Sequence, residues 1–357
     1  MTKTKIAIIT DTHFGVRNDI SHFLESQGRF FKDTFFPKID ELGIDTILHM
    51  GDVFDRRKYV NFSTLNECRK FFFNEVAKRN IKLYIILGNH DTYYRNTNSI
   101  NSISLLLQEY PNIHILYEPQ TIQIKETLFV SIPWICEENE KQCWEEMSKT
   151  KAEVCIGHFA IQGFEMHVGA PSKDGIPHTE FKKFDLLLSG HFHHRSKGDN
   201  IFYLGAPYEM TWSDYNDKKG FHIFDTATRN LEFVQNPCNM FTKIEYDESY
   251  FLDNPINYEN YRNKYIKVII TNRKNLLKFD GFLKSLYNVN PYDVKILETF
   301  VDFSSGNISD EINVEDTMSI LNGYIDTVTT SVNKEKLKLY LKSLHAEAIA
   351  SSNVIKE

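Results

Sequence analysis

Apolar runs and amphipathic stretches alternate along the first part of the chain. The apolar runs are short and rich in β-branched side chains, which is typical of buried parallel strands, and they cover residues 5–10, 45–50 and 83–87. Between them, apolar side chains recur at helical spacing over residues 21–42 and 63–79, with Ser63 as the expected N-cap of the second helix. This order predicts β-α-β units that build a parallel sheet.

The pattern changes near residue 120, where shorter stretches alternate between apolar and polar positions. Residues 121–124 and 128–132 are predicted as antiparallel strands, and further strands are expected at residues 153–156, 186–189, 201–204 and 220–224. We expect these strands to form a meander in a second sheet. The predicted fold class is therefore α/β, with a two-sheet β-sandwich flanked by helices.

The remainder of the chain predicts a small α/β domain followed by a pair of helices. A strand, a helix and a second strand are expected at residues 265–271, 276–287 and 293–299. Two amphipathic helices are expected near the end of the chain. We divide the chain into a first domain at 1–245, a small domain at 246–303, a linker at 304–313 and a helical segment at 314–357.

Composition narrows the class of protein. The net charge of −7 argues against a generally basic nucleic-acid binder, so any contact with DNA requires a local basic patch. The small domain could supply such a basic patch, because residues 262–298 contain eight Lys or Arg but only three acidic residues. No stretch reaches membrane-spanning length, and the five cysteines form no Cys-x-x-Cys pair. We expect free thiols and a cytoplasmic location.

Metal-binding side chains follow the predicted strands at the points where they end. The tetrapeptide Gly88-Asn89-His90-Asp91 comes directly after an apolar run, and four other strand ends carry similar groups. Because the carboxyl ends of strands in open α/β sheets form ligand sites, we expect these side chains to converge. The candidate residues are Asp11, His13, Asp52, Asn89, His90, Asp91, His158, His191 and His193.

The donor set indicates a two-metal site. Imidazole, carboxylate and amide groups without a thiolate suit Mn²⁺, Fe²⁺ or Zn²⁺ better than Ca²⁺. The set exceeds what one octahedral ion can use, whereas two ions about 3.5–4 Å apart can share it. Asp52 is the best candidate for a bridging carboxylate. A single Gly-His at a strand end is more often an ordinary histidine, but five such motifs in order are not expected by chance.

These five motifs resemble those of the calcineurin-like metallophosphoesterases over residues 5–225. Within that superfamily, residues 51–56 and 203–207 are similar to the SbcD-type double-strand-break repair nucleases. Residues 132–134 and 136–139 add a similarity to the recombination endonuclease subunits of T-even-like phages. One departure is Asp55, because some relatives carry a histidine there.

The resemblance implies roles for the candidate residues. It implies two Mn²⁺ ions, with Mg²⁺ or another divalent ion as alternatives, and Asp52 as the bridge between them. His90 would contact the scissile phosphate and assist departure of the sugar oxygen, while Asp91 would orient His90 or its loop. One ion would be held by Asp11, His13 and His193, and the other by Asn89, His158 and His191.

The resemblance also implies a function and partners. It implies a Mn²⁺-dependent DNA exonuclease and endonuclease of recombination and double-strand-break repair, acting as a homodimer with an SMC-like coiled-coil ATPase. Residues 314–357 would bind that ATPase, and the small domain would cap the nuclease and contact DNA. If the gene belongs to a phage, the enzyme would work in the host cytoplasm. The expected DNA contacts are Arg262, Lys264, Lys267, Arg273 and Lys274.

Several alternatives remain open from the sequence. The same metal loops would serve a phosphatase or a small-nucleotide phosphodiesterase. A non-enzymatic scaffold that binds DNA and the ATPase is a third hypothesis. The basic residues of the small domain could form an ordinary solvated face, and the terminal helices could pack on their own core or dimerise.

Overall fold

The computed structural model describes residues 4–167, 169–253, 256–298 and 334. The predicted linker and the two predicted terminal helices lie outside the described residues. Among the helices that are described, none is long and apolar enough to cross a bilayer. The five cysteines are free thiols, of which only Cys238 is exposed.

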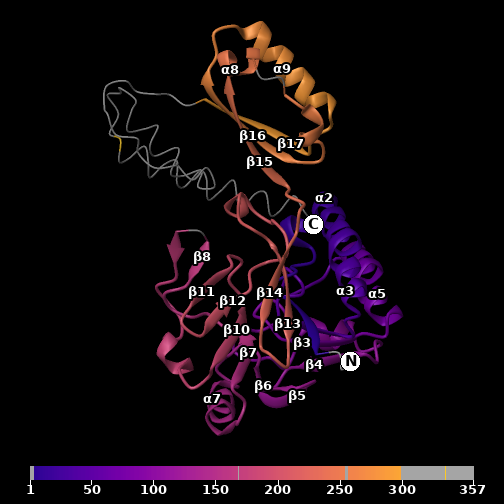
Figure 1. Ribbon diagram of the computed structural model, residues 1–357, viewed down its shortest axis with the longest axis vertical. Helices are drawn as coiled ribbons and strands as arrows, with labels where there is room; N and C mark the ends of the chain where they lie inside the picture. Colours follow the sequence, from indigo (N-terminus) through magenta and orange to yellow (C-terminus); the bar gives the residue numbers. More distant parts are fainter. Residues whose placement is uncertain (1–3, 168, 254–255, 299–333, 335–357) are drawn as a thin grey trace. The chain divides into compact units, whose positions relative to one another are not determined.

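The first sheet has six strands in the order β14-β13-β1-β2-β3-β4 (Figure 1). Strands β1 to β4 are parallel, as predicted, whereas β13 pairs antiparallel with β1 and β14 with β13. Their bounds are β1 (Lys5–Ile9), β2 (Thr46–His49), β3 (Lys82–Ile86), β4 (Ile113–Leu116), β13 (Gly220–Asp225) and β14 (Leu231–Gln235).

Helices connect the parallel strands of this sheet. The predicted helix at 21–42 consists of α2 (Ser21–Phe30), a π-helical turn at Phe31–Phe35 and α3 (Phe36–Leu42). The second comprises α4 (Phe62–Cys68), a π-helical turn at Arg69–Phe73 and α5 (Asn74–Lys78), and α6 (Ser102–Leu106) follows β3. The helical turn α1 (Val16–Asp19) contains left-handed residues.

The N-cap predicted for the second helix was wrong. The cap of α4 is Asn61, whose side chain accepts a hydrogen bond from the backbone N–H of Ser63 at 2.8 Å. An amide oxygen two residues ahead satisfies one of the free N–H groups of the first turn, so the helix starts at Phe62 and places Ser63 inside that turn.

The second sheet differs from the predicted meander. Its order is β11-β12-β10-β7-β6-β5, and β6, β7, β10 and β12 are mutually parallel. Only β5–β6 and β11–β12 are antiparallel pairs, and the strand at 220–225 belongs to the first sheet instead. The bounds are β5 (Gln120–Ile124), β6 (Thr127–Ile132), β7 (Val154–His158), β10 (Leu186–Gly190), β11 (Ser196–Gly198) and β12 (Ile201–Tyr203).

A crossover helix explains why the prediction failed for this sheet. Helix α7 (Glu140–Lys149) lies between β6 and β7 in the sequence, and such a connection lets two neighbouring strands run parallel. The 3-10 turn at His178–Phe181 lies in the connection from β7 to β10, and these two strands are also parallel. A small hairpin of β8 (Glu165–His167) and β9 (Ala170–Pro171) lies in the β7–β10 connection.

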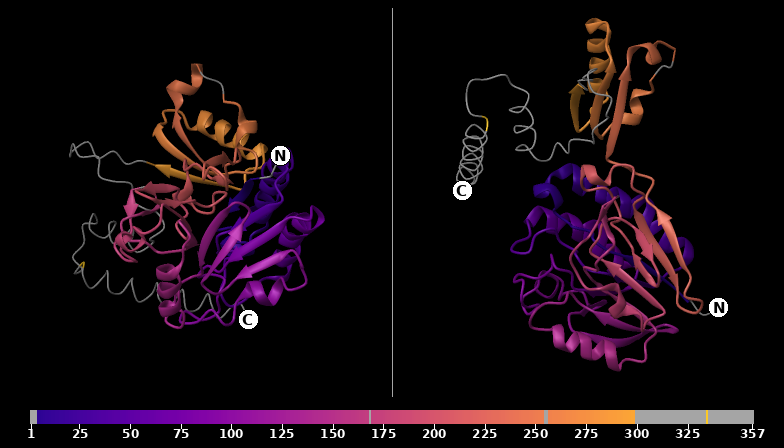
Figure 2. Two further views of the ribbon diagram at one scale, coloured as in Figure 1. Left: turned by 60° about the horizontal axis from the view of Figure 1, so that its bottom comes forward. Right: turned by 90° about the vertical axis from the view of Figure 1, so that its left-hand side faces the viewer.

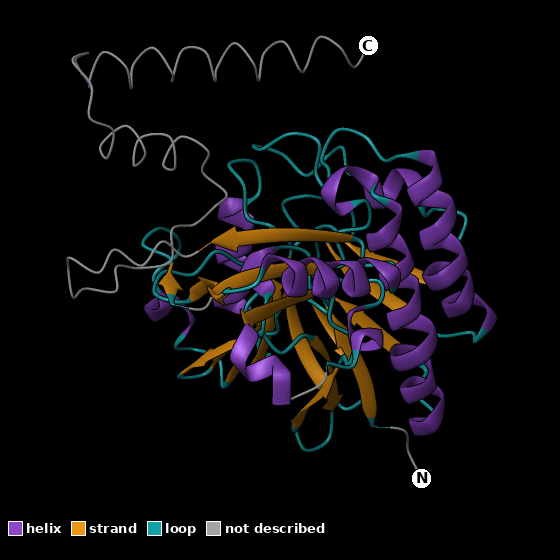
Figure 3. Ribbon diagram, turned by 90° about the horizontal axis from the view of Figure 1, so that it is seen from above, coloured by secondary structure: helices purple, strands orange, loops and turns teal. Residues whose placement is uncertain are grey.

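The two sheets pack face to face, as predicted. Along β1, Ile6 and Ile8 belong to the core shared with Phe129 and Ile156 of the second sheet, whereas Ile9 packs under the helices. Burying each such side chain contributes about 1.5–3 kcal/mol. Several helices run along one side of the strands (Figure 3). The structure therefore has the predicted sandwich flanked by helices.

A separate three-stranded parallel sheet follows, in the order β15-β16-β17. Its first strand was not predicted, whereas β16, α9 and β17 occur where the pattern placed them. Tyr246, Val268 and Phe282 belong to its own buried core, and helix α9 runs along the sheet (Figure 2). The bounds are β15 (Phe241–Asp247), α8 (Glu248–Asp253), β16 (Tyr265–Asn272), α9 (Leu276–Asn288) and β17 (Asp293–Glu298), with a 3-10 turn at Tyr258–Tyr261. Another 3-10 turn, at Trp212–Asp214, comes before β13 in the sequence.

Candidate metal centre

The loops that follow five strands bring the candidate metal-binding side chains together. These strands are β1, β2 and β3 of the first sheet and β7 and β10 of the second. The loops after β1 and β2 are joined by backbone hydrogen bonds, from the N–H of Asp11 to the carbonyl of Gly51 at 3.0 Å and from the N–H of His13 to the carbonyl of Asp52 at 3.1 Å. Because both sheets are parallel at their centres, the strand ends meet at one edge of the sandwich.

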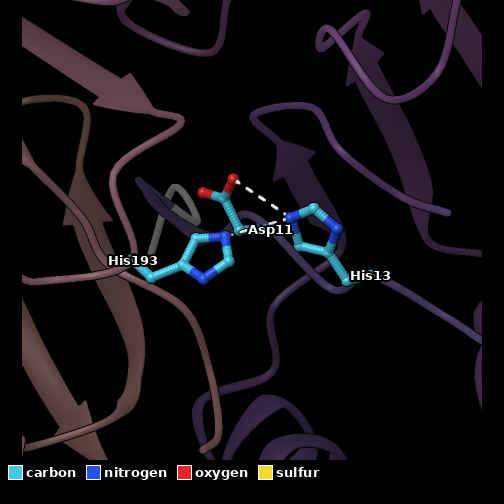
Figure 4. A group of neighbouring side chains, drawn as sticks. All are labelled: Asp11, His13 and His193. Atoms are coloured by element: carbon cyan, nitrogen blue, oxygen red, sulfur yellow. Dashed lines mark hydrogen bonds and ion pairs between the residues drawn. The ribbon is translucent and has the colours of Figure 1, made fainter. Parts of the chain in front are cut away.

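Asp11, His13 and His193 form one cluster with their ligand atoms within 4.8 Å of one another (Figure 4). The Nε2 atom of His13 lies 3.1 Å from Nε2 of His193 and 3.9 Å from Oδ1 of Asp11. The hydroxyl of Thr10 donates to the Asp11 carboxylate at 2.7 Å, and the N–H of His191 donates to it at 3.1 Å. These contacts hold the carboxylate in place beside the two imidazoles.

Asp52, His158 and His191 form a second cluster, and the side chain of Asn89 reaches into it. The Oδ1 atom of Asn89 lies 2.9 Å from Nδ1 of His191 and 3.2 Å from Nε2 of His158. The Nδ1–H of His158 donates to the carbonyl of Met50 at 2.8 Å. This hydrogen bond leaves Nε2 as the nitrogen that faces the cluster, where a metal ion would bind once the Nε2 proton is released.

Asp52 lies between the two clusters. Its Oδ2 atom is 3.5 Å from Nε2 of His13 and 3.3 Å from Nε2 of His158. Its Oδ1 atom accepts a hydrogen bond from the backbone N–H of His90 at 2.8 Å. One carboxylate therefore faces an imidazole of each cluster, which is the arrangement that a bridging ligand needs.

The backbone at this edge is strained. Asp11, His13, Asp52 and His191 have positive φ angles of 52°, 39°, 54° and 89°. Such conformations are uncommon in residues other than glycine, and they concentrate at functional sites. Gly88 is required for a different reason, because a Cβ atom there would lie 2.2 Å from Oδ1 of Asp52. The close approach of the two loops thus depends on a residue without a side chain.

The charges of the site influence one another strongly. Burial disfavours protonation of His158, but the carboxylates of Asp52 and Asp11 outweigh it and raise the pKa of His158 to about 9. Burial and the nearby His158 lower the pKa of His191 to about 3. Burial also opposes ionisation of Asp52, but the neighbouring imidazolium of His158 holds the pKa of Asp52 well below its usual range. The site therefore holds an ionised Asp52 carboxylate beside a protonated His158, whereas His191 is neutral.

His90 points its ring at the same site. Its Nδ1–H donates to the backbone carbonyl of Asp55 at 2.5 Å, so that Nε2 is the nitrogen left for other contacts. The ring lies edge-on to His13 with 4.8 Å between centroids. A ligand atom of His90 also forms a cluster with those of His13 and Asp52. The side chain is therefore next to the candidate metal ligands.

Asp91 acts on the loops that surround the site. Its buried carboxylate accepts hydrogen bonds from the backbone N–H groups of Gly88, Asp52 and Val53, each at 2.9 Å. Burial and the negative charge of Asp52 raise the pKa of Asp91 to about 7. Asp91 thus joins the loop after β3, which carries His90, to the loop after β2.

The structure brings further residues to the site. The Asp55 carboxylate lies 3.4 Å from Nδ1 of His13. Nδ1 of His49 accepts from the N–H of Gly51 at 3.3 Å, and its Nε2 lies 3.0 Å from the hydroxyl of Thr12. The ammonium of Lys219 donates to the backbone carbonyl of His193 at 2.8 Å. Of these, only Asp55 carries a sequence signal, because it closes the Gly-Asp-x-x-Asp motif.

The basic residues expected to contact DNA lie on the small sheet and its loops, where other groups contact them. Arg262 pairs with Glu259 at 2.9 Å, and Lys264 donates to the Asn239 side chain at 2.8 Å. The ammonium of Lys267 lies over the ring of Trp212, and the guanidinium of Arg273 lies over the ring of Phe279. The backbone N–H of Lys274 donates a hydrogen bond to the Glu248 carboxylate.

The donor set fits two divalent ions. Asp52 of the second cluster also faces His13 of the first, and the hydrogen bond from Nδ1–H of His158 turns its Nε2 toward the second cluster. Nitrogen and oxygen donors without a thiolate match Mn²⁺, Fe²⁺ or Zn²⁺. Paired ions held in this way are the arrangement found in hydrolytic two-metal sites.

Comparison with known proteins identifies the class. The profile of the family described as calcineurin-like phosphoesterase matches residues 4–195 of the chain. The chain therefore belongs to this family, and it is an enzyme of the metal-dependent phosphoesterase class. The resemblance inferred from the strand-end motifs is confirmed.

Individual relatives cover almost the whole chain. Exonuclease subunit 1 of Enterobacteria phage T4 is 30% identical over 348 residues, which cover 96% of this chain and 99% of the relative. The SbcD component of the nuclease SbcCD of Staphylococcus epidermidis is 23% identical, covering 94% and 97% of the two chains. The DNA double-strand break repair protein Mre11 of Methanocaldococcus jannaschii is 24% identical, covering 83% and 89%.

Proposed function

We propose that the protein is a two-metal DNA exonuclease and endonuclease that hydrolyses phosphodiester bonds in recombination and double-strand-break repair. The observation that carries the proposal is the pair of donor clusters linked by Asp52, which belongs to the second cluster and lies 3.5 Å from His13 of the first, with His90 beside them. The names of the relatives support the choice of DNA, since all three are described as nucleases or as DNA-break repair proteins.

In this proposal, each cluster would hold one ion, and Asp52 would supply a carboxylate to both. When bound, the ions would lower the pKa of a water molecule and neutralise charge on the phosphate. Asp91 keeps the loops after β2 and β3 in register through its three backbone hydrogen bonds. One ion would be held by Asp11, His13 and His193, and the other by Asn89, His158 and His191.

His90 has the geometry of a general acid. The carbonyl of Asp55 fixes the Nδ1–H proton, so a second proton can be held only at Nε2. From there it can pass to the sugar oxygen as the P–O bond breaks, which neutralises the leaving group. The same imidazolium would stabilise negative charge on the phosphate oxygens.

The finer parts of the proposal concern the ion, the partners and the domains. We infer Mn²⁺ as the working ion, with Mg²⁺ or another divalent ion as the alternative. Residues 246–303 would cap the nuclease and contact DNA, and residues 314–357, beyond the linker at 304–313, would bind an SMC-like coiled-coil ATPase. The enzyme would act as a homodimer in the cytoplasm, or in the host cytoplasm if a phage encodes it.

A nuclease assay tests the proposal. The purified chain is incubated with labelled single- and double-stranded DNA in Mn²⁺, Mg²⁺ or EDTA, beside His90→Ala and a control, His114→Ala, which removes an exposed histidine of β4. We expect cleavage with Mn²⁺ and none in EDTA. The His90 variant should lose about 10²–10⁴-fold in rate with its metal content unchanged, whereas the control keeps full activity.

The assay also separates the alternatives. Turnover of p-nitrophenyl phosphate or a cyclic nucleotide far faster than of DNA would transfer the function to a phosphatase or small-nucleotide phosphodiesterase. Metal binding without hydrolysis of any phosphoester would favour the scaffold hypothesis and overturn the proposal.

A further inference from the structure

Two loops beside the metal centre carry cations and aromatic rings that the proposed chemistry does not use. The first loop runs from β2 to α4 and contains Arg57. The second follows β3 and contains Tyr93, Tyr94 and Arg95. The loops meet at the hydrogen bond from the His90 ring to the Asp55 carbonyl. Whatever these side chains bind would therefore lie next to the scissile bond.

Arg56 and Arg57 are adjacent in the sequence but differ in their contacts. Arg56 pairs with Asp19 at 2.8 Å, donates to the Asn18 side chain at 2.8 Å and lies over the ring of Tyr59. By contrast, Nη1 of Arg57 is buried and has no hydrogen-bond partner among the described residues. A buried guanidinium N–H without an acceptor is costly, so this position favours an incoming anion.

Arg95 brings a second positive charge to the same place. Burial and the charge of Arg95 both lower the pKa of Arg57, while the charge of Asp52 acts in the opposite direction. No carboxylate lies within ion-pair distance of Arg57 or Arg95 among the described residues. Two cations that lack an ion-pair partner are suited to a phosphate group, which guanidinium groups bind through paired hydrogen bonds.

Tyr93 and Tyr94 directly precede Arg95 in the second loop. Their side chains are 38% and 48% exposed, and the rings stand edge to face with 4.7 Å between centroids. The loop that carries them is held in shape by a hydrogen bond from the N–H of Tyr93 to the carbonyl of Ile100 at 2.9 Å. Another runs from the N–H of Glu138 to the carbonyl of Asn96 at 3.1 Å. Exposed aromatic rings on an ordered loop are suitable surfaces for stacking nucleobases.

We propose that Arg57, Arg95, Tyr93 and Tyr94 form a subsite for an unpaired nucleotide that adjoins the scissile phosphate. The arginines bind the phosphate of that nucleotide, and a tyrosine ring stacks on its base. The subsite takes an unpaired nucleotide because the faces of bases inside a closed duplex are covered by their neighbours. This inference rests on the proposed DNA nuclease function and names the form of DNA that it holds.

Equilibrium binding tests the subsite without hydrolysis. Binding of a fluorescein-labelled single-stranded oligonucleotide to the full chain is followed by fluorescence anisotropy in EDTA. We expect Arg57→Gln and Tyr94→Ala to raise the Kd about tenfold each, since stacking on one base alone accounts for a change of that order. Arg57→Gln should also reduce the slope of log Kd against log salt by about 0.7, the value for one phosphate contact on a single strand.

Two matched variants serve as controls. Tyr94→Phe keeps the ring and should bind as tightly as the unchanged chain. Lys82→Gln removes an exposed charge at the amino end of β3, opposite the loop that carries Arg95, and should change the Kd less than twofold. Thermal unfolding and Mn²⁺ content, measured for every variant, show that the fold and the metal centre are retained.

The outcomes separate this inference from the proposed function. Unchanged oligonucleotide affinity in both Arg57→Gln and Tyr94→Ala would overturn the subsite, even if the unchanged chain cleaves DNA. Tenfold losses in a chain that cleaves no DNA with any metal would support the subsite and overturn the nuclease proposal. A covalently closed circular duplex is the last comparison, because an equal loss of affinity for it in Tyr94→Ala would contradict stacking on an unpaired base.

Discussion

Lys219 is only 4% exposed, and its ammonium group is surrounded by acceptors. It lies 2.8 Å from the Asp214 carboxylate and 2.9 Å from that of Asp217, and it donates to the backbone carbonyl of His193. The charge of Lys219 helps to hold the pKa of Asp214 below its ordinary value, against the opposing effect of burial. A buried ion pair thus supports the backbone of a candidate metal ligand.

Replacing this lysine should cost both stability and metal affinity. We expect Lys219→Met to lower the free energy of unfolding by about 3–5 kcal/mol, because it leaves the buried Asp214 carboxylate without its partner. The affinity for Mn²⁺ should fall about 10–100-fold as His193 loses its support. Urea unfolding and a metal titration measure the two effects, with the exposed Lys218→Met as control. A variant as stable as the unchanged chain would contradict the structural role of the ion pair.

The sequence alone predicted part of the candidate site. Asp11, His13, Asp52 and the histidines of the later motifs could be selected because each stands directly after an apolar run, and this pattern is local in sequence. Lys219 could not be selected, because no feature of residues 211–220 indicates that its side chain is buried. Its burial results from contacts with residues that only the folded chain brings near.

At the scale of elements, Glu209 connects the nuclease sandwich to the small sheet. Its buried carboxylate accepts hydrogen bonds from the backbone N–H groups of Met240 at 2.6 Å and Phe241 at 2.9 Å, where β15 begins. Burial, with a further contribution from Asp214, raises the pKa of Glu209 from 4.5 to about 7. The start of β15 is therefore tied to a carboxyl group that titrates near neutrality.

This raised pKa predicts a loss of stability as the pH rises. Below pH 4.5 the carboxyl is protonated in both the folded and the unfolded chain, so its contribution is fully present. Between pH 4.5 and 7 only the unfolded chain releases the proton, and this contribution to the free energy of unfolding falls by about 3 kcal/mol. Urea unfolding over this range should show a steeper fall for the unchanged chain than for Glu209→Gln. The exposed Glu180→Gln is the control, and parallel pH profiles for Glu209→Gln and the unchanged chain would refute the prediction.

The direction of the strands in the second sheet was predicted wrongly from the sequence pattern. The alternation at 121–124 and 128–132 correctly indicated a hairpin, which forms as β5 and β6. The later strands were assigned to the same meander, yet β6, β7 and β10 are parallel. An apolar run does not encode the direction of its neighbour, because direction depends on the connection and on the sheet that receives the strand.

For the whole molecule, the chain divides after residue 299, and the described residues up to 298 belong to the first, compact unit. Among the described residues, the four hydrophobic clusters and the three metal-binding groups all belong to the first unit. We therefore expect metal binding and DNA cleavage to depend on the first unit.

Removing residues 314–357 tests this division. We expect the shortened chain to bind the same amount of Mn²⁺ and to cleave single-stranded DNA at a rate within twofold of the full chain. It should fail to co-purify with the proposed coiled-coil ATPase, which we expect the full chain to retain. An intact complex with the shortened chain would place the ATPase contact elsewhere, and loss of Mn²⁺ binding would show that the metal centre needs the terminal residues.

The sequence by itself determined the family, the two-layer α/β fold and the set of donors after the strands, since all three depend on short-range patterns of apolar runs and polar strand ends. Only the tertiary structure decided the direction of the inner strands of the second sheet, the contacts of Asp91 with the loops and the burial of Lys219. The distances from Asp52 to His13 and His158 belong to the same group, although Asp52 was already the candidate bridge in the sequence. These features arise where residues distant in sequence meet, and a local pattern does not specify which of them come into contact.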